Sequence, residues 1–552
     1  MDSSTPNSVS DRPENSAALS AEAPAQTGNA VRKTPSLTNA VGKSTLLGIV
    51  ANAAQVGTRL FTVPIVIHHL GLGGYGIWNI IMMTATYMRF GSVGIKSAFQ
   101  KYVAEATGSG EYTQANRLLS TGCAVMFVFS VLVLIPVSFF SRKIALAAGI
   151  PPEFLLSASG SISLLALILA MANIGAPYEA IVMGGHRVDL VRRFGTILTI
   201  AEAVCIVIVL RLGYGLFAMS AIMGASELLY IACCYIAARR VVPEIHVRVK
   251  DITWRALPEL FRFAGSYQLV NILEVLYSSI VPFAILRTFG ADPAGIYGVV
   301  TRVVSSAVIL QDSFLSPILS GGTMVHASGS TERMQRLLVK AFKVTLGLSL
   351  LPLGFIAVFG SQMALAWTGQ SNSAFELSFW LVCATSFFRS FSMLSLVLYR
   401  VSGKALLDNV RQVLRIVILL IVALLAPKLG FIGVLTGLAT AELVGMIFML
   451  FALMKTFRHF HVGALLSDGL RLSAAAILIL GAGMLASYFP LPGSYVGQAA
   501  ATFRVCEVAL ASALVAWPAL RLTGSITSSE GRALLDVFRF RRTQTAATNS
   551  GN

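Results

Sequence analysis

Charged residues are scarce in this chain. Of its 552 residues only 12% are Asp, Glu, Lys or Arg, whereas 55% are hydrophobic. A soluble domain carries about 25% charged residues. The deficit runs along the chain, which excludes an ordinary soluble domain and indicates that lipid is the solvent for most of it.

Cysteine pairs and a secretion signal are also missing. The six cysteines all lie in apolar stretches and none forms a CxxC pair, which argues against a disulfide framework or a zinc site. Residues 1–40 are rich in Ser, Ala, Asn, Thr and Pro and hold no apolar run. They predict a disordered tail rather than a signal peptide.

No complete nucleotide-binding motif is present. The segment AVGKST at 40–45 lacks the first glycine of a P-loop, since Leu37 occupies that position. The segment GLGGYG at 71–76 matches GxGxxG, but it lies between two apolar stretches, where we expect a short outer loop with a tight turn. We therefore expect no cofactor and no ATPase activity.

Apolar stretches near 20 residues recur from residue 45 to residue 522. A helix of about 20 residues crosses a hydrocarbon core of about 30 Å. Because the stretches are continuous rather than alternating, they predict helices and not a β-barrel. We predict an all-α polytopic membrane protein with about fourteen transmembrane helices, at residues 45–68, 76–97, 118–140, 155–177, 194–211, 215–237, 262–287, 295–320, 341–362, 376–399, 407–427, 431–454, 470–489 and 501–522.

Lysine and arginine are distributed unevenly between the two sets of loops. With a cytoplasmic N-terminus, about 32 fall on the inner side and about 6 on the outer side. This asymmetry explains the net charge of +17 without a nucleic-acid partner. It predicts a bacterial inner-membrane protein with both termini in the cytoplasm.

The sequence repeats itself at an offset of 217–219 residues. Gly76-Ile77-Trp78 matches Gly295-Ile296-Tyr297, and LGYGLFAM at 212–219 resembles LGFIGVLT at 429–436. The repeat predicts two six-helix lobes in the same orientation, and such repeats place a transport site between them. The expected domains are a tail (1–40), an N-lobe (41–237), a cytoplasmic linker (238–257), a C-lobe (258–457), two appended helices (466–523) and a second tail (524–552).

Two predicted spans carry polar stripes at helical spacing. In the first span these residues are Thr45, Gly48, Asn52, Gln55, Arg59 and Thr62, and in the seventh they are Tyr267, Asn271, Glu274 and Ser278. A polar face in a membrane helix points to a cavity or to another helix. Hydrogen bonds that only hold helices together would give the same pattern.

Further ionisable residues lie within the predicted spans: Arg89, Glu202, Glu227, Arg302, Asp312, Arg389, Glu442 and Glu507. A cavity that holds Arg59, Arg89 and Arg302 would suit an anion, because a guanidinium matches phosphate oxygens. Buried ion pairs without a transport role are the alternative.

Glu274 is the candidate for ion coupling. It lies near the middle of its span, and its repeat partner is Gln55, which cannot titrate. An isolated carboxylate at that depth would tend to bind a proton. The alternative is a structural ion pair with an arginine such as Arg302.

The sequence resembles the multidrug/oligosaccharidyl-lipid/polysaccharide exporter superfamily. The resemblance lies in the two six-helix halves, the two extra helices, the LGxxxYGIW-like segment within 68–80 and its LGFxG-type counterpart after the eleventh span. The similarity is greatest to the polysaccharide-biosynthesis and O-antigen flippases, over residues 41–457 and 466–523. The resemblance implies a V-shaped pair of lobes and alternating access.

The resemblance also implies a polyprenyl-diphosphate-linked oligosaccharide as substrate. Arg59, Arg89 and Arg302, with Asn52, Gln55 and Asn271, are the residues that could bind it. A flippase is a transporter and not an enzyme, and its partners would be the lipid-linked glycan, membrane lipid, a polysaccharide polymerase and glycosyltransferases. A drug or metabolite cation antiporter is the alternative; a membrane glycosyltransferase or polymerase is disfavoured by the short outer loops.

Overall fold

The computed structural model describes residues 37–88, 93–327, 331–401, 406–456, 462–489 and 497–525. This part of the chain is α-helical apart from turns and two single-turn 3-10 helices in the segment 242–256. An all-helical fold is expected in lipid, because a helix satisfies its own backbone hydrogen bonds. The α-helices are α1 (Leu37–Met88), α2 (Val93–Ser109), α3 (Tyr112–Ala147), α4 (Pro152–Gly184), α5 (Val188–Arg211), α6 (Leu216–Val241), α7 (Leu257–Phe289), α8 (Ala291–Ala327), α9 (Thr331–Thr368), α10 (Ser373–Val401), α11 (Leu406–Thr456), α12 (Val462–Ser487) and α13 (Gln498–Leu522).

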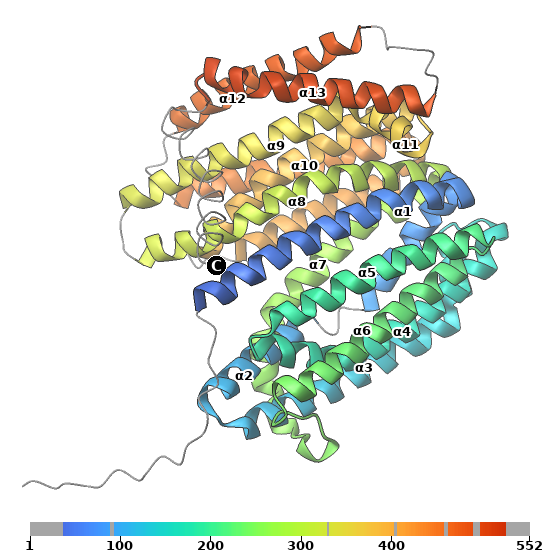
Figure 1. Cartoon of the computed structure of the whole chain (residues 1–552), viewed down its shortest axis with the longest axis vertical. Coiled ribbons are helices and arrows are strands. Elements are labelled where there is room, and N and C mark those ends of the chain that lie inside the picture. The colour runs from blue at the N-terminus through green and yellow to red at the C-terminus, as the bar shows by residue number, and fades with distance from the viewer. Residues whose placement is uncertain are drawn as a thin grey trace, which may run out of the picture.

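The helices form two groups that repeat one packing plan. In the first half, α1 packs on α5 and α4 packs on α3 and α6. In the second half, α7 packs on α11 and α10 packs on α9 and α11. Figure 1 shows α1 beside α8 between the two groups, with α12 and α13 at the outer edge against α9.

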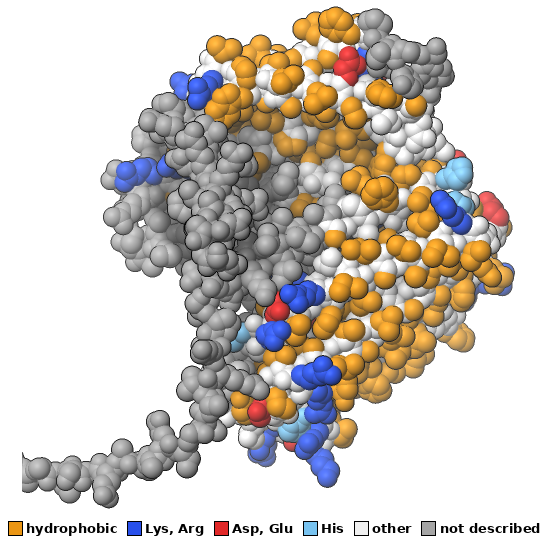
Figure 2. All heavy atoms as spheres, viewed as in Figure 1, with side chains coloured by type: hydrophobic (Ala, Val, Ile, Leu, Met, Phe, Trp, Pro, Cys, Tyr) orange, Lys and Arg blue, Asp and Glu red, His pale blue; other side chains and the backbone are white. Residues whose placement is uncertain are grey.

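The surface is apolar, as a membrane requires. Leu156, Leu424 and Leu514 are 86%, 82% and 76% exposed, and hydrophobic side chains cover much of the face in Figure 2. Ten helical stretches of the described residues are long and apolar enough to cross a membrane. The chain is therefore an all-α polytopic membrane protein, and the count of fourteen crossings stays a prediction.

The expected loop at 71–76 is reduced to a turn at Gly71, and residues 72–76 are helical. Helix α1 continues to Met88, and only Gly71 breaks it, with φ 73° and ψ 172°. A positive φ is accessible to glycine at little cost, so the chain turns at a single residue. Helix α11 contains the same break at Gly430, with φ 71° and ψ 173°.

Other predicted boundaries also shift. Helix α2 ends at Ser109, beyond the expected end of the second span at 97, and α6 ends at Val241 before α7 begins at Leu257. Helix α1 begins at Leu37, inside the predicted tail of residues 1–40, and residues 1–36 and 526–552 lie outside the described part.

Glycines with positive φ recur at the offsets of the sequence repeat. Gly71 pairs with Gly290, Gly149 with Gly369 and Gly213 with Gly430, at separations of 219, 220 and 217 residues. Each of these glycines lies where one helical segment ends and the chain turns into the next. We call this side of the molecule the glycine end, and the side that carries residues 242–256 the linker end.

Candidate functional site

The structure describes the side chains of only some of the predicted site residues. The side chains of Asn52, Gln55, Arg59 and Asn271, and the whole of Arg89, lie outside the described residues. Their proposed roles stay predictions. The structure does place Glu274 and Arg302, and it separates them.

Glu274 is not isolated. Its Oε1 accepts a hydrogen bond from Arg389 Nη2 at 2.5 Å, and its Oε2 accepts one from Gln412 Nε2 at 2.5 Å. Arg415 Nη1 lies 3.9 Å from the same Oε2. The ion pair weighed as the alternative is therefore present, with Arg389 from α10 as the partner instead of Arg302.

The network continues deeper into the second half. Arg415 pairs with Glu442, and both side chains are fully buried. Tyr277 donates its hydroxyl hydrogen to Glu442 Oε1 at 2.6 Å, and its ring lies 3.6 Å from the Arg415 guanidinium carbon. One helical turn away, the buried Arg411 donates to Asp408 Oδ1 at 2.7 Å.

We call six charged groups from three helices the ion-pair network: Glu274, Arg389, Arg415 and Glu442, which these contacts connect, and the pair Asp408 and Arg411 on the same face of α11. Three are arginines and three are carboxylates, so the sum of the formal charges is zero. Burying a charge is costly unless it is paired, which explains why each of the six groups lies beside a group of opposite charge.

Sequence reasoning missed the α11 residues of this network. Asp408, Arg411, Gln412 and Arg415 are spaced at three, four and seven residues, which puts them on one helical face. That periodicity was visible in the sequence. They lie near the cytoplasmic end of the predicted span 407–427, where charged residues are common, so the pattern did not stand out from that of a cytoplasmic loop.

A cavity of about 500 Å³ lies beside the network, among α7, α8, α10 and α11. Arg389 and Glu442 line it, together with Tyr277, Tyr297 and Thr385. Glu442 Oε2 is buried and makes no hydrogen bond within the described residues. The cavity has the room and the polar partners to hold water beside the network.

Arg302 faces a different space. The opposite face of α8 contributes Arg302 to a pocket of about 350 Å³, bounded by α1, α9 and α13. The other walls are mostly apolar, with Val303, Ile356 and Met363 among them. Within the described residues Arg302 has no carboxylate partner, so the pocket presents a positive charge against apolar walls.

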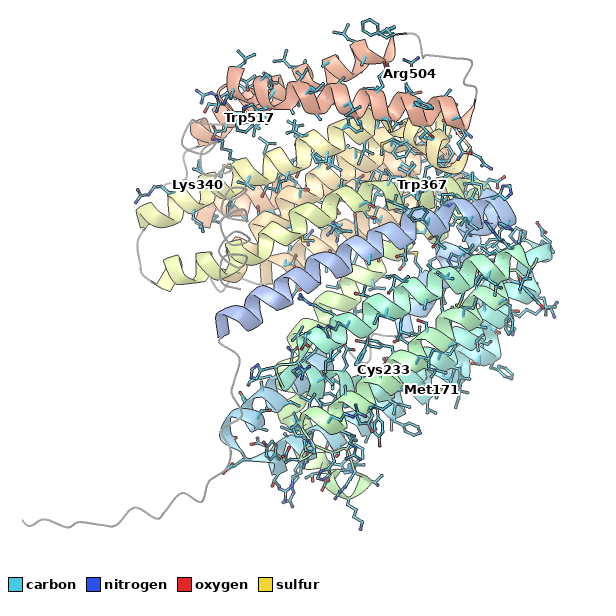
Figure 3. All side chains as sticks on the ribbon, in the orientation of Figure 1. Met171, Cys233, Lys340, Trp367, Arg504 and Trp517 are labelled. Atoms are coloured by element: carbon cyan, nitrogen blue, oxygen red, sulfur yellow. The ribbon has the colours of Figure 1, made fainter. Side chains whose placement is uncertain are left out.

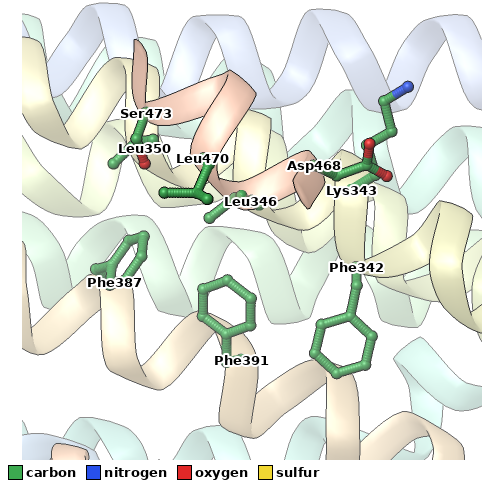
Figure 4. Close-up of a pocket in the computed structure, with 10 residues that line it drawn as sticks. Phe342, Lys343, Leu346, Leu350, Phe387, Phe391, Asp468, Leu470 and Ser473 are labelled. Carbon is green, nitrogen blue, oxygen red and sulfur yellow. The ribbon is translucent and has the colours of Figure 1, made fainter. Parts of the chain in front are cut away.

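A second apolar groove of about 320 Å³ lies between α9, α10 and α12. Figure 4 shows Phe387 and Phe391 below Leu346 and Leu470. Lys343 and Asp468 lie together to one side. The groove combines a long apolar wall with polar groups at one side.

The first half has its own polar pocket among α2, α4 and α6. Lys96 Nζ lies 2.6 Å from Glu179 Oε2, and Glu227, Tyr230 and Asn173 line the same pocket. Its volume of about 50 Å³ leaves space for water and not for a large substrate.

The two halves meet directly at the glycine end. A Cβ atom on Gly76 would lie 2.5 Å from the carbonyl oxygen of Ala291 and 2.6 Å from the nitrogen of Gly295. A Cβ on Gly295 would in turn collide with the backbone of Leu72. The backbones therefore touch, and the seam between the halves is closed at this end.

No family model matches the chain, and no curated protein matches it either. Solved structures do match. The lipid II flippase MurJ in an inward closed conformation aligns with a TM-score of 0.66 and 14% identity, over 87% of this chain and 98% of its own.

Two further structures share the arrangement. An inward-facing multidrug resistance MATE family transporter aligns with a TM-score of 0.63 and 13% identity, over 76% of this chain and 99% of its own. The second is a MOP superfamily transporter from Pyrococcus furiosus, described as having a binding pocket of reverse polarity. It aligns with a TM-score of 0.55 and 15% identity, over 75% of this chain and 95% of its own. The repeat of helix packing, the closed seam and these alignments lead to one conclusion: the chain has the fold of the multidrug/oligosaccharidyl-lipid/polysaccharide exporter superfamily.

Proposed function

We propose that the chain is a flippase that moves a polyprenyl-diphosphate-linked oligosaccharide across the bacterial inner membrane by alternating access of its two halves. Both termini lie in the cytoplasm in this proposal. Glycosyltransferases would supply the lipid-linked glycan, and a polysaccharide polymerase would consume it.

The observation that carries the proposal is Arg302 in its apolar pocket. A charge in a membrane segment is expensive, and Arg302 is not offset by a carboxylate of the described residues. A diphosphate attached to an isoprenoid chain offers both a bidentate partner for the guanidinium and an apolar tail for the walls.

The appended helices support the same substrate class. The groove of Figure 4 lies between α12 and the second half, and its aromatic walls suit an isoprenoid chain. The aligned lipid II flippase covers 87% of this chain against 76% for the aligned MATE transporter.

The alternative, a cation antiporter, has the same fold in its favour. An exported cation needs a carboxylate that is free to bind it. In the second half, Glu274, Asp408 and Glu442 are all paired with arginines. This pairing favours the anionic lipid-linked substrate.

The remaining assignments belong to the proposal. Arg59, Arg89, Asn52, Gln55 and Asn271 would bind the diphosphate and the first sugars in the cleft between the halves. Glu274 would couple transport to a proton or cation gradient. Because Arg389 already holds this carboxylate, coupling requires the incoming cation to compete with the arginine.

Deletion of the chain tests the function. Lipid-linked glycan should accumulate on the cytoplasmic leaflet, where an added glycosidase reaches it only in inside-out vesicles, and surface polysaccharide should fall. An Arg302→Ala variant should restore transport poorly, and Arg302→Lys only partly, because lysine loses the bidentate geometry. Normal surface glycan together with sensitivity to cationic drugs would instead support the antiporter.

A further inference from the structure

Pro64 leaves a carbonyl group of α1 without its helical partner. In an α-helix the carbonyl of Leu60 accepts from the N–H of residue 64, but proline has no N–H. The helix nevertheless continues through this position. The free carbonyl lies in a membrane segment, where an unpaired polar group is costly.

A tryptophan from the other half supplies the missing donor. Trp367 Nε1 donates a hydrogen bond to the Leu60 carbonyl oxygen at 2.7 Å, across 307 residues of sequence. Trp367 lies in the last turn of α9, and Figure 3 labels it beside α1. The bond therefore links the first half directly to the second.

The appended helices hold this tryptophan in place. Gln498, the first residue of α13, donates its side-chain amide to the carbonyl of Ala366 at 3.0 Å. The last carbonyls of a helix lack partners of their own, so this contact caps the end of α9. Trp367 is therefore restrained by two contacts. Its indole donates to Leu60 of α1, and Gln498 of α13 donates to the carbonyl of the preceding residue, Ala366.

The link exists on only one side of the repeat. Pro282 in α7 is the counterpart of Pro64 at an offset of 218, so Ser278 has lost its donor in the same way as Leu60. The α3–α7 contact is the counterpart of the α9–α1 contact. At the offset of 220 shown by Gly149 and Gly369, however, the counterpart of Trp367 is Ala147, which has no donor. The fold alone does not require the bond, which points to a specific role.

We propose that Trp367 is a latch between the halves, and that its hydrogen bond to Leu60 stabilises the state closed at the glycine end. The proposal rests on alternating access in the proposed function, because opening this end separates α1 from α9 and breaks the bond. The bond also forms part of the wall of the Arg302 pocket, which Leu60 and Trp367 both line. Opening the latch therefore changes the shape of that pocket.

The test measures conformation and not transport. Spin labels at Tyr214 in the first half and Leu429 in the second, both exposed at the glycine end, report the separation of the halves by pulsed electron paramagnetic resonance. The six native cysteines are first replaced. Trp367→Phe should raise the ratio of open to closed molecules by about fivefold to tenfold, the size expected for one lost hydrogen bond.

Pro64→Ala makes the test specific. It restores an N–H to the Leu60 carbonyl, so it should weaken the latch, and Trp367→Phe should then add little in the double variant. Trp380→Phe is the matched control, since Trp380 is 49% exposed on α10 and its indole makes no hydrogen bond within the described residues. It should leave the distances unchanged.

Unchanged distances in Trp367→Phe, or effects of the two substitutions that simply add, would overturn the latch. Should Trp367→Phe fail to insert, Gln498→Ala removes the restraint from α13 and should shift the population in the same direction by a smaller factor. A null result there would also count against the latch. If the protein does not transport the lipid-linked substrate in a separate assay, the label distances should still change as described. That result would count against the proposed function alone.

Discussion

Gly76 of α1 and Gly295 of α8 lie against each other across the seam between the two halves. The same two glycines are counterparts in the internal repeat, at an offset of 219 residues. A pseudo-symmetric pair in mutual contact lies near the axis that relates the halves. Glycine, the smallest residue, therefore lies at the centre of the closed glycine end.

Gly76→Leu should hold the glycine end open. The new side chain would begin 2.5 Å from the carbonyl oxygen of Ala291, which is backbone and cannot rotate away. The Tyr214–Leu429 label distance should therefore lengthen. Gly57→Ala on the same helix is the control, because a Cβ atom added at Gly57 would meet no described atom within 4 Å; an equal shift in both variants would contradict the seam.

Removing one partner of the Arg415–Glu442 pair should destabilise the protein strongly. Both side chains are fully buried, and an unpaired buried charge costs about 3–5 kcal/mol. Arg415→Met should lower the thermal midpoint in detergent, and adding Glu442→Leu should recover much of the loss. Arg504→Ala breaks the partly exposed pair with Glu507 and should cost about 1 kcal/mol or less.

The Glu274→Gln variant distinguishes a role of Glu274 in ion coupling from a purely structural ion pair with Arg389. Glu274 and Arg389 have side chains that are 28% and 38% exposed, and Arg389 lines the 500 Å³ cavity, so water can reach the unpaired guanidinium. We expect a folded, inserted protein whose transport no longer depends on the proton or sodium gradient. Unchanged gradient dependence in a well-expressed variant would end the coupling assignment, and poor expression would favour a structural pair.

Topology is tested by labelling single cysteines with an impermeant reagent. Positions in 238–257 should be labelled only in inside-out vesicles, and positions in 67–75 and 288–294 only from outside. The expectation follows from the Lys and Arg asymmetry. Labelling of 238–257 in intact cells would reverse the assignment of the two ends.

The sequence predicted the broad architecture because helix length and repetition leave strong patterns. The match of Gly76-Ile77-Trp78 to Gly295-Ile296-Tyr297 indicated the repeat. The structure shows the same repeat in the backbone, since Gly71 and Gly290 both have positive φ. The sequence did not predict that the turn is confined to Gly71 and that residues 72–76 are helical, because a glycine-rich segment between apolar stretches is equally typical of a loop.

The site was harder to predict because partners come from distant segments. Glu274 was visible as a buried carboxylate, but Arg389 lies 115 residues away and Gln412 lies 138 residues away. A pattern within one helix says nothing about which residue faces it from another. The link from Trp367 to Leu60 was equally hidden, since its acceptor is a backbone carbonyl that no side-chain pattern reveals.

The zero net charge of the ion-pair network has an electrical consequence. A membrane potential acts on a moving charge with about 2.3 kcal/mol per elementary charge per 100 mV across the full field. Three arginines and three carboxylates that move together carry no net charge, so the voltage does no net work as the network shifts along the field. Once a proton or sodium ion binds, the same body carries one positive charge, and the potential can drive it. The network itself would then contribute to voltage sensitivity only in its cation-loaded form.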